Sequence, residues 1–433
     1  MASSPSNITR CLNISKASAG IHRSASETVE LRGHIIDSQV LPKILDQIMA
    51  LGADYSIEAI EIGHSRRDES YAKVRIEAPE ARTLHKILEL ITRSGAILSR
   101  SEDAAMECAP RKGVLPDDFY ATTNLPTDVL LNGKWVSVTN TEMDCAIVVD
   151  PKMRSARCVR MHRVKKDDLI VVGHAGIRVE PPHRSPEHRV FEFMGSAVSS
   201  EKPKLLVIRE IALQMRAVRA AGKKILFVGG PAIIHTGAGE HLEALIRRGF
   251  VDVLFAGNAL AAHDIEASMF GTSLGVSLKS GTPVEHGHEH HLRAINRIRA
   301  VGSIHAAVKK NILKNGVMVA CVDKNIPFVL SGSIRDDGPL PDVITDMPAA
   351  QDAMRTHIRG VGLALMVGTT LLSIATGNMM PAAVKTICVD INPSVVTKLA
   401  DRGTFQAIGL VTDAELFLRT LTRELGLKNK GEA

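Results

Sequence analysis

Aromatic residues are scarce in this sequence. Phe, Trp and Tyr make up 3% of the 433 residues, and Trp135 is the sole tryptophan. Proteins that bind single-stranded nucleic acid stack bases on aromatic faces, so this composition argues against that class. The net charge is +6, but Lys and Arg are interspersed with Asp and Glu and form no continuous basic stripe. We therefore expect no nucleic-acid partner.

Cysteine pairs are also missing. The six cysteines lie far apart in the chain, and no two of them form a C-x-x-C motif. Such spacing offers neither a disulfide framework nor the ligands of a structural zinc site, and it is typical of a reducing compartment. We therefore expect a cytoplasmic protein. The cysteines are Cys11, Cys108, Cys145, Cys158, Cys321 and Cys388.

One uncharged segment, residues 360–384, is long enough to span a bilayer. It contains glycines, threonines, an asparagine and a proline, and it stands among segments patterned as strands and helices. A buried strand, loop and helix explains this composition better than a membrane span. We therefore expect no membrane partner.

The first hundred residues divide into a tail and a small module. Residues 1–27 are predicted to be a tail, because up to residue 26 they include seven serines, three basic residues and no acid. This composition suits a disordered tail and also an organellar targeting peptide. Residues 28–108 then show the periodicities of the order β-α-β-β-α-β, which predicts a ferredoxin-like α+β module. Such modules are often regulatory or oligomer-forming, and we expect a homo-oligomer.

The rest of the chain changes pattern at about residue 199. Short alternating runs broken by Asp-Pro, Gly-Lys and Pro-Pro predict a small strand-rich domain over residues 109–198. In residues 199–433, strongly apolar segments alternate with helical patterns. Strands that are apolar on both faces and separated by helices predict an α/β domain with a parallel sheet covered on both sides. These segments are 224–230, 251–258, 326–333, 363–370, 385–392 and 407–415.

The predicted parallel strands end in small or polar residues. Such ends share one edge of the sheet, where ligands bind, and we interpret this edge as a crevice for a nucleotide and a substrate. Asp390 ends one strand, where a carboxylate accepts hydrogen bonds from ribose hydroxyls or caps the next helix. Asn258 and Asp413 hold equivalent positions. The stretch 229–242, GGPAIIHTGAGEHL, is suited to holding an anion near its backbone, although Leu242 stands where a dinucleotide motif has its third glycine.

Charged and histidine side chains accompany these strand ends. In the loop 331–342, Arg335 is suited to clamping a carboxylate, although a plain polar turn would have the same composition. His235 and His263 are candidates for an acid or base near neutral pH, and each could equally be a structural histidine. The four histidines within residues 286–291 match no established metal-ligand spacing. We therefore predict no metal site.

Three of these segments together resemble a known family. Residues 229–266, 331–342 and 387–403 are similar to the archaeal NAD-dependent ornithine cyclodeaminases, a family that also supplies the C-terminal half of the cyanobacterial arginine dihydrolase/ornithine cyclodeaminase. The resemblance extends over residues 28–425. It implies a cofactor domain of the deoxyhypusine synthase type, a relative of the Rossmann sheet with different glycine spacing. The NAD contacts that it implies are Asn258, Ala259, Asp337, Thr369, Thr370, Leu371, Leu372, Asp390, Asp413 and Ala414.

The resemblance also implies a reaction. L-Ornithine would become L-proline and ammonia, and NAD+ would take a hydride from Cα and return it without net redox change. Such a lyase needs a carboxylate near the amines, a cation for the substrate carboxylate and a base, for which Asp264, Arg335 and either His235 or His263 are candidates. Two alternatives are an NAD-dependent dehydrogenase of lysine- or saccharopine-like amino acids and an NAD-binding sensor without turnover.

Overall fold

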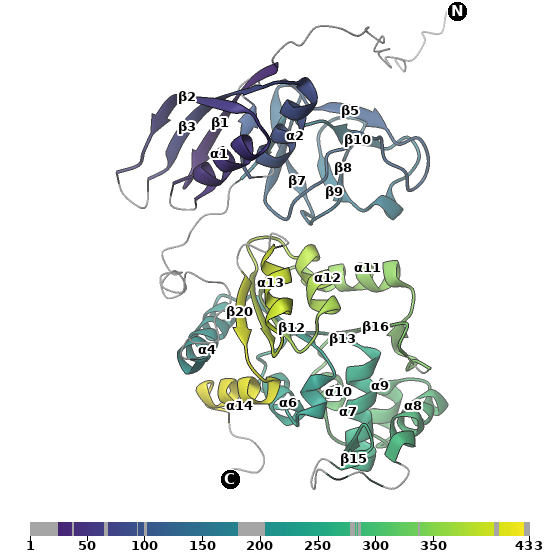
Figure 1. The fold of residues 1–433 in the computed structure, drawn as a ribbon. Coiled ribbons are helices and arrows are strands. Elements are labelled where there is room, and N and C mark those ends of the chain that lie inside the picture. Colours follow the sequence, from purple (N-terminus) through teal and green to yellow (C-terminus); the bar gives the residue numbers. More distant parts are fainter. Residues whose placement is uncertain are drawn as a thin grey trace, which may run out of the picture. The chain divides into compact units, whose positions relative to one another are not determined.

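Figure 1 shows the computed structural model with its elements labelled. The chain forms two compact units, Met1–Ser99 and Arg100–Ala433. Of the predicted tail, residues 1–24 lie outside the described residues, whereas residues 25–27 already belong to the first strand. The structure describes residues 25–36, 39–64, 68–92, 94–98, 102–180, 204–277, 282, 284, 287–336, 338–401 and 407–427.

The first unit has the strand order of the expected ferredoxin-like module. Its sheet is ordered β2-β3-β1-β4, and β1 pairs antiparallel with both β3 and β4. Leu41, Ile44 and Ile48 recur at helical spacing and are buried, because this period places them on the one face of α1 that packs on the sheet. The elements are β1 (Ala25–Gly33), α1 (Val40–Ala50), β2 (Asp54–Glu61), β3 (Ser70–Ala78), α2 (Ala81–Thr92) and β4 (Ile97–Leu98).

The second unit begins with the predicted strand-rich region. Its strands form one sheet in the order β11-β6-β7-β9-β8-β10-β5. Strand β5 pairs antiparallel with β10, so residues 105–108 belong to this sheet and not to the ferredoxin-like module, in which the sequence placed them. Local periodicity does not reveal such a long-range pairing. The strands are β5 (Ala105–Cys108), β6 (Thr127–Leu131), β7 (Lys134–Thr139), β8 (Ala146–Val149), β9 (Ala156–Val159), β10 (Leu169–Val172) and β11 (Ile177–Val179).

A parallel seven-stranded sheet forms the centre of the C-terminal part. Its order is β17-β16-β13-β12-β18-β19-β20, and every neighbouring pair is parallel. Apart from the added β17, this is the doubly wound order of a Rossmann sheet, which confirms the predicted fold class. The strands are β12 (Lys224–Gly229), β13 (Val253–Gly257), β16 (Phe328–Ser331), β17 (Val343–Ile344), β18 (Val361–Val367), β19 (Lys385–Asp390) and β20 (Ala407–Val411).

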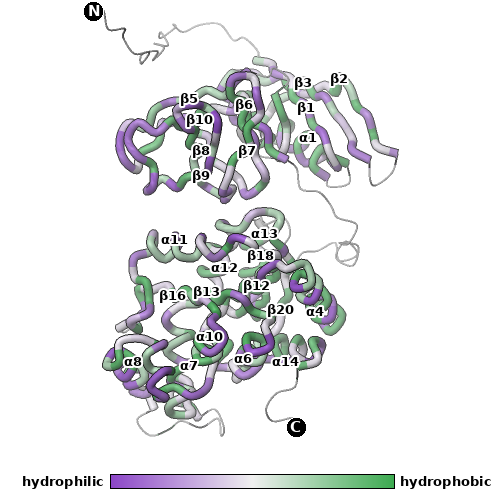
Figure 2. Tube along the Cα trace, turned by 180° about the vertical axis from the view of Figure 1, so that it is seen from behind, coloured by the Kyte–Doolittle hydropathy of each residue, from purple (hydrophilic) through white to green (hydrophobic). Residues whose placement is uncertain are grey.

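Helices cover both faces of this sheet because its strands are apolar on both sides. Leu363 and Leu365 of β18 pack into one core, and Ala364 and Met366 pack into the other. Figure 2 shows helices α11 to α13 over one face and α6, α7, α10 and α14 over the opposite face. The α-helices of this part are α4 (Lys204–Ala220), α5 (Ala232–His235), α6 (Gly239–Arg247), α7 (Asn258–Phe270), α8 (His290–Val301), α9 (Ile304–Lys309), α10 (Val317–Asp323), α11 (Met347–Ile358), α12 (Leu371–Met379), α13 (Pro393–Asp401) and α14 (Ala414–Glu424).

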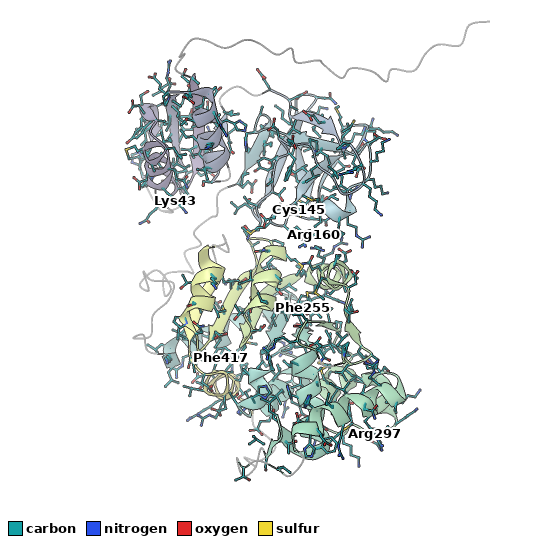
Figure 3. All side chains as sticks on the ribbon, turned by 45° about the vertical axis from the view of Figure 1, so that its right-hand side comes forward. Lys43, Cys145, Arg160, Phe255, Arg297 and Phe417 are labelled. Carbon is teal, nitrogen blue, oxygen red and sulfur yellow. The ribbon has the colours of Figure 1, made fainter. Side chains whose placement is uncertain are left out.

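Large aromatic side chains fill both cores. Phe255 of β13 lies in the core beneath α11 to α13, whereas Phe417 of α14 lies in the core on the other face (Figure 3). The uncharged segment 360–384 is the buried strand β18 followed by a loop and α12, as the composition predicted. Among the described residues, no helix combines the length and the apolar character needed to cross a membrane.

Candidate active site

The carboxyl ends of the parallel strands meet at one edge of the sheet. The register places Gly229 of β12 beside Val367 of β18, and Gly257 of β13 beside Ser331 of β16. From β12 the chain continues into α5 (Ala232–His235) and α6 on one face, whereas from β18 it continues into α12 on the other face. Ligands of open parallel sheets bind where the connections diverge in this way. The strand ends therefore share one edge of the sheet, as the sequence predicted.

At this edge the chain segments that follow β12 and β18 pass close to each other, and each has a glycine at the contact, Gly230 and Gly368. The N–H of Gly230 donates to the carbonyl oxygen of Val367 at 3.0 Å. A Cβ atom on Gly230 would lie 1.8 Å from the carbonyl oxygen of Gly368, so a residue with a side chain does not fit. Gly230 thus has the packing role of a dinucleotide-motif glycine, although the spacing in GGPAIIHTGAGEHL is different.

The residues predicted to contact NAD after β18 lead into the N-terminus of α12. Thr369 and Thr370 are partly exposed, and Leu371 is 82% exposed at the start of the helix. The side chain of Thr370, the N-cap residue, forms no capping hydrogen bond. The first N–H groups of a helix lack partners within it and carry partial positive charge, so this end is suited to a phosphate group. Leu372 packs against the core below.

The two aspartates at the strand ends accept hydrogen bonds from the backbone that follows them. Oδ1 of Asp390 accepts from the N–H of Asn392 at 2.9 Å, which leaves the other carboxylate oxygen for a ligand. Asp413 caps α14, because its Oδ1 accepts from the N–H groups of Glu415 and Leu416. Ala414 is buried as the first residue of that helix. In both aspartates the described residues leave the second carboxylate oxygen available to a ligand.

Asn258 forms a hydrogen bond with the loop that follows β16. This side chain is buried, and its Oδ1 accepts from the N–H of Leu340 at 3.1 Å. Ala259 follows it in the first turn of α7 and is partly exposed. Arg335 is exposed, and no described residue binds its guanidinium, so it is available to an anionic group. Asp337 lies outside the described residues.

The carboxylate of Asp264 is bound by backbone groups of another helix. Its carboxylate accepts from the N–H groups of Val317 at 2.9 Å and Met318 at 2.8 Å, which caps the N-terminus of α10. Burial raises the pKa of Asp264 to about 7, although both hydrogen bonds favour the charged form. The sequence placed this residue at the start of a helix, but α7 begins at Asn258 and Asp264 lies in its second turn. Its carboxylate therefore faces α10 and not the histidines.

The carboxylate beside the histidines belongs to Glu266, a fully buried residue. Its Oε2 lies 2.9 Å from Nδ1 of His263, one helical turn earlier on α7. The ring of His263 is 4.6 Å from the ring of His235, measured between centroids, and Nδ1 of His235 lies 2.7 Å from Oγ of Ser273. The structure thus brings the two candidate histidines together with an unpredicted acid.

Hydrogen bonds keep Glu266 ionised. Burial alone would raise its pKa, but hydrogen bonds from His263, the N–H of Gly275 and the hydroxyl of Thr272 lower it below its usual value. An ionised carboxylate only accepts, so Nδ1 of His263 carries the proton, and no described residue binds its Nε2. Burial, and then the neighbouring His263, lower the pKa of His235. The lowered pKa holds the imidazole of His235 in its neutral form near neutral pH.

Glu266 could have been found in the sequence from its spacing. His263 and Glu266 are three residues apart, so on a helix they share one face.

Two histidines of the histidine-rich stretch lie near this cluster: Nδ1 of His290 is 2.8 Å from the hydroxyl of Thr272, and the ring of His291 is 6.1 Å from the ring of His263. Within the described part of the chain, no three His, Cys, Asp or Glu side chains are arranged to hold a metal ion. His286 lies outside that part.

The fold and this edge define a Rossmann-type nucleotide-binding protein with acid–base groups nearby. Residues 209–421 match the family model of the C-terminal Rossmann fold of ArgZ-like arginine dihydrolases, residues 126–208 match the first region of that C-terminal part, and residues 26–125 match the conserved region of the LOR/SDH bifunctional enzyme. The ornithine cyclodeaminase of Methanothermobacter thermautotrophicus is 51% identical over 402 residues, which are 93% of this chain and 98% of that protein. The chain belongs to this ornithine cyclodeaminase family.

Solved structures support the same relationship. The crystal structure of a LOR/SDH protein from Methanococcus maripaludis is 52% identical and superposes with a TM-score of 0.71, covering 75% of this chain and 98% of the other. AgrE of Nostoc sp., a bifunctional arginine dihydrolase/ornithine cyclodeaminase, is 44% identical, and the match covers 92% of this chain and 58% of AgrE. A ternary complex of AgrE with ornithine and NAD+ superposes with a TM-score of 0.51 over 94% of this chain.

Proposed function

We propose that the protein converts L-ornithine to L-proline and ammonia with NAD+ as a catalytic cofactor. The observation that carries this proposal is the ternary complex of AgrE with ornithine and NAD+, because 42% of residues are identical over 94% of this chain. Proteins named ornithine cyclodeaminase at about half identity over nearly their whole length support the same activity. No net oxidation occurs, so the enzyme would be an ammonia-lyase.

The strand edge supports the cofactor assignment. The N-terminus of α12 would receive the pyrophosphate, and the crossing of Gly230 and Gly368 would hold the backbone close beneath it. Asp390 would accept a hydrogen bond from a ribose hydroxyl through the carboxylate oxygen that the turn leaves unused. Asn258 and the loop that it ties would border the other end of the cofactor. When bound there, NAD+ would supply hydride acceptance and return at the substrate Cα.

The histidine cluster supplies the proton transfers of the proposed reaction. The δ-amine must lose a proton before it attacks Cα, and the departing α-amine must gain one. His263 would act as the base through Nε2 while Glu266 holds Nδ1, and His235 would exchange protons with it across their ring contact. We therefore propose Glu266, in place of Asp264, as the acidic member of the site. Arg335 remains the proposed partner of the substrate carboxylate.

A turnover assay tests this function. Purified protein with ornithine and NAD+ should produce proline and ammonia in equal amounts, with no accumulation of NADH. Accumulating NADH without proline would identify an amino-acid dehydrogenase instead. NAD binding without turnover of ornithine would identify a sensor, and either outcome would overturn the proposal.

A further inference from the structure

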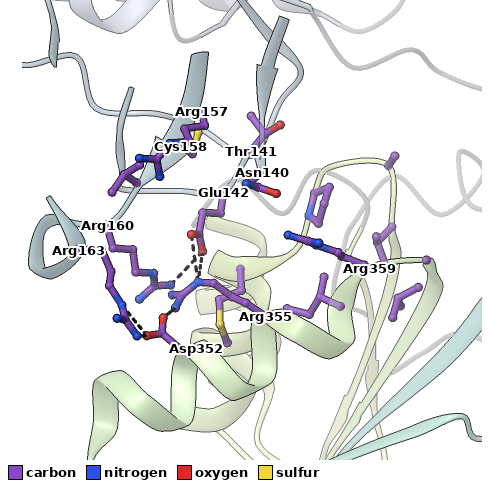
Figure 4. A pocket seen from close by; sticks show the side chains of 18 residues that line it. Asn140, Thr141, Glu142, Arg157, Cys158, Arg160, Arg163, Asp352, Arg355 and Arg359 are labelled. Carbon is purple, nitrogen blue, oxygen red and sulfur yellow. Dashed lines mark hydrogen bonds and ion pairs between the residues drawn. The ribbon is translucent and has the colours of Figure 1, made fainter. Parts of the chain in front are cut away.

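A cavity of about 530 Å³ lies at the end of the parallel sheet opposite the proposed cofactor edge. It is bordered by Val361, the first residue of β18, and by Met379, the last residue of α12. The same two elements have their other ends at Val367 and Leu371, at the proposed cofactor edge. Strand β9 and the loop after β7 form the facing wall (Figure 4). The cavity is therefore distinct from the cofactor crevice.

Arginines dominate the walls of this cavity. Five arginines face two carboxylates, those of Glu142 and Asp352, which leaves a surplus of three positive charges. A cavity lined by one sign of charge concentrates ions of the other sign. The arginines are Arg157, Arg160, Arg163, Arg355 and Arg359 (Figure 4).

The two carboxylates are already bound by some of these arginines. Glu142 is buried, and its Oε2 accepts from Nε of Arg355 at 2.8 Å and from Nη2 of Arg160 at 3.2 Å. Asp352 accepts from Nη1 of Arg355 at 2.8 Å and also binds Arg163. The internal acids therefore neutralise part of the wall and leave the rest of its charge uncompensated.

Several guanidinium donors point to an external partner. Nη2 of Arg355 and Nε of Arg160 are buried, and no described residue accepts a hydrogen bond from them. Arg157 and Arg359 are exposed at the cavity, and neither forms an ion pair or side-chain hydrogen bond with the described residues. Buried donors without acceptors are rare and unfavourable, so these atoms are suited to an acceptor that enters from solvent.

We propose that this cavity binds a small oxyanion, a carboxylate or a phosphate carried by a metabolite. Planar guanidinium groups bind both kinds of anion through paired hydrogen bonds. The cavity volume falls in the range of small-molecule sites. Ile358, Met379 and Val384 also line it, and they provide an apolar surface for the carbon skeleton of the ligand.

The test is calorimetric titration of the NAD-saturated protein, because bound NAD blocks anion binding at the cofactor edge. Inorganic phosphate and succinate serve as separate probes, so the two sources of the oxyanion are distinguished. We expect at least one of them to bind, and we expect Arg359→Gln and Arg157→Gln each to weaken that binding about tenfold. Both positions are exposed, so neither substitution threatens folding. Arg82→Gln, at an exposed position on α2, is the matched control and should leave binding unchanged.

Two results would overturn the proposal. One is the absence of heat with both probes in the millimolar range for the NAD-saturated protein. The other is binding that Arg359→Gln and Arg157→Gln leave unchanged, or that Arg82→Gln weakens equally. A preceding titration with NAD+ alone reports separately on the proposed cofactor. The anion result therefore does not depend on ornithine turnover.

Discussion

The carboxylate of Glu266 and the imidazole of His263 form a buried pair, with 2.9 Å between Oε2 and Nδ1. Glu266 is fixed from further directions by Thr272 and by the N–H groups of Leu274 and Gly275. A carboxylate held in this way sets the tautomer and the orientation of the imidazole. One turn of α7 thus supplies both the imidazole proposed as the base and the carboxylate that orients it.

We predict that Glu266→Gln lowers kcat at least about 10²-fold while NAD binding is retained. The negative charge of Glu266 raises the pKa of His235, although burial and His263 lower it overall. Without that charge, the protonated form of His235 is less favoured. The acidic limb of the kcat profile should therefore move to lower pH, measured by proline production across pH. A variant with full activity and an unshifted profile would show that Glu266 is only structural.

Unlike Glu266→Gln, which should lower kcat, Asp264→Asn should reduce the stability of the protein and leave kcat nearly unchanged. Its carboxylate accepts two N–H groups, whereas an amide oxygen replaces only part of this cap, so we expect a loss of about 1–3 kcal/mol. Because the pKa of Asp264 is raised from 3.8 to about 7 in the folded protein, its contribution to stability is lost as the pH rises from the first value to the second. The difference in unfolding free energy between wild type and variant should therefore shrink from acidic to alkaline pH. A difference that grows with pH would contradict the raised pKa.

Gly230→Ala should abolish NAD binding or prevent folding of the parallel sheet. The new methyl group would lie 1.8 Å from a backbone oxygen of Gly368, and the two crossing connections cannot separate without opening the edge. Gly239→Ala is the matched control, because its methyl group would meet only the flexible end of Ile234 at 3.1 Å. Thermal denaturation and NAD titration of both variants provide the measurement. If Gly230→Ala binds NAD with wild-type affinity, the close contact between Gly230 and Gly368 is not part of the cofactor site.

Asp390→Ala should weaken NAD binding at least about tenfold, as expected for a lost hydrogen bond to a charged group. Asp390→Asn is the informative companion, since its amide oxygen retains the turn to Asn392 but loses the charge. We expect intermediate affinity for Asp390→Asn and an unchanged melting temperature in the absence of NAD. If both variants bind NAD with wild-type affinity, the carboxylate of Asp390 only stabilises the turn to Asn392 and does not contact the cofactor.

The apolar patterns predicted the sheet, but much of the site depends on contacts between segments that are distant in the sequence. Each long strand of the parallel sheet overlaps its predicted apolar run, because burial on both faces requires a continuous apolar segment, although β18 begins at Val361, two residues before the predicted run. The two-residue strand β17 and the short helix α5 were missed, since neither is long enough to show a period. Asp264 and Glu266 stand two residues apart with similar chemistry. The spacing of His263 and Glu266 offered a local signal for their contact, whereas only the tertiary structure shows that Asp264 caps α10.

The last prediction follows the hydride and separates the proposed lyase from a dehydrogenase. Ornithine deuterated at Cα should give proline that retains its deuterium, because the hydride removed from Cα returns to the same carbon within one turnover. Retention requires the reduced cofactor to stay bound until ring closure and ammonia loss are complete. Mass spectrometry of proline and the absorbance of NADH provide the two measurements. Labelled NADH released in proportion to the ornithine consumed, with no labelled proline, would refute the internal hydride return and with it the assignment as a lyase.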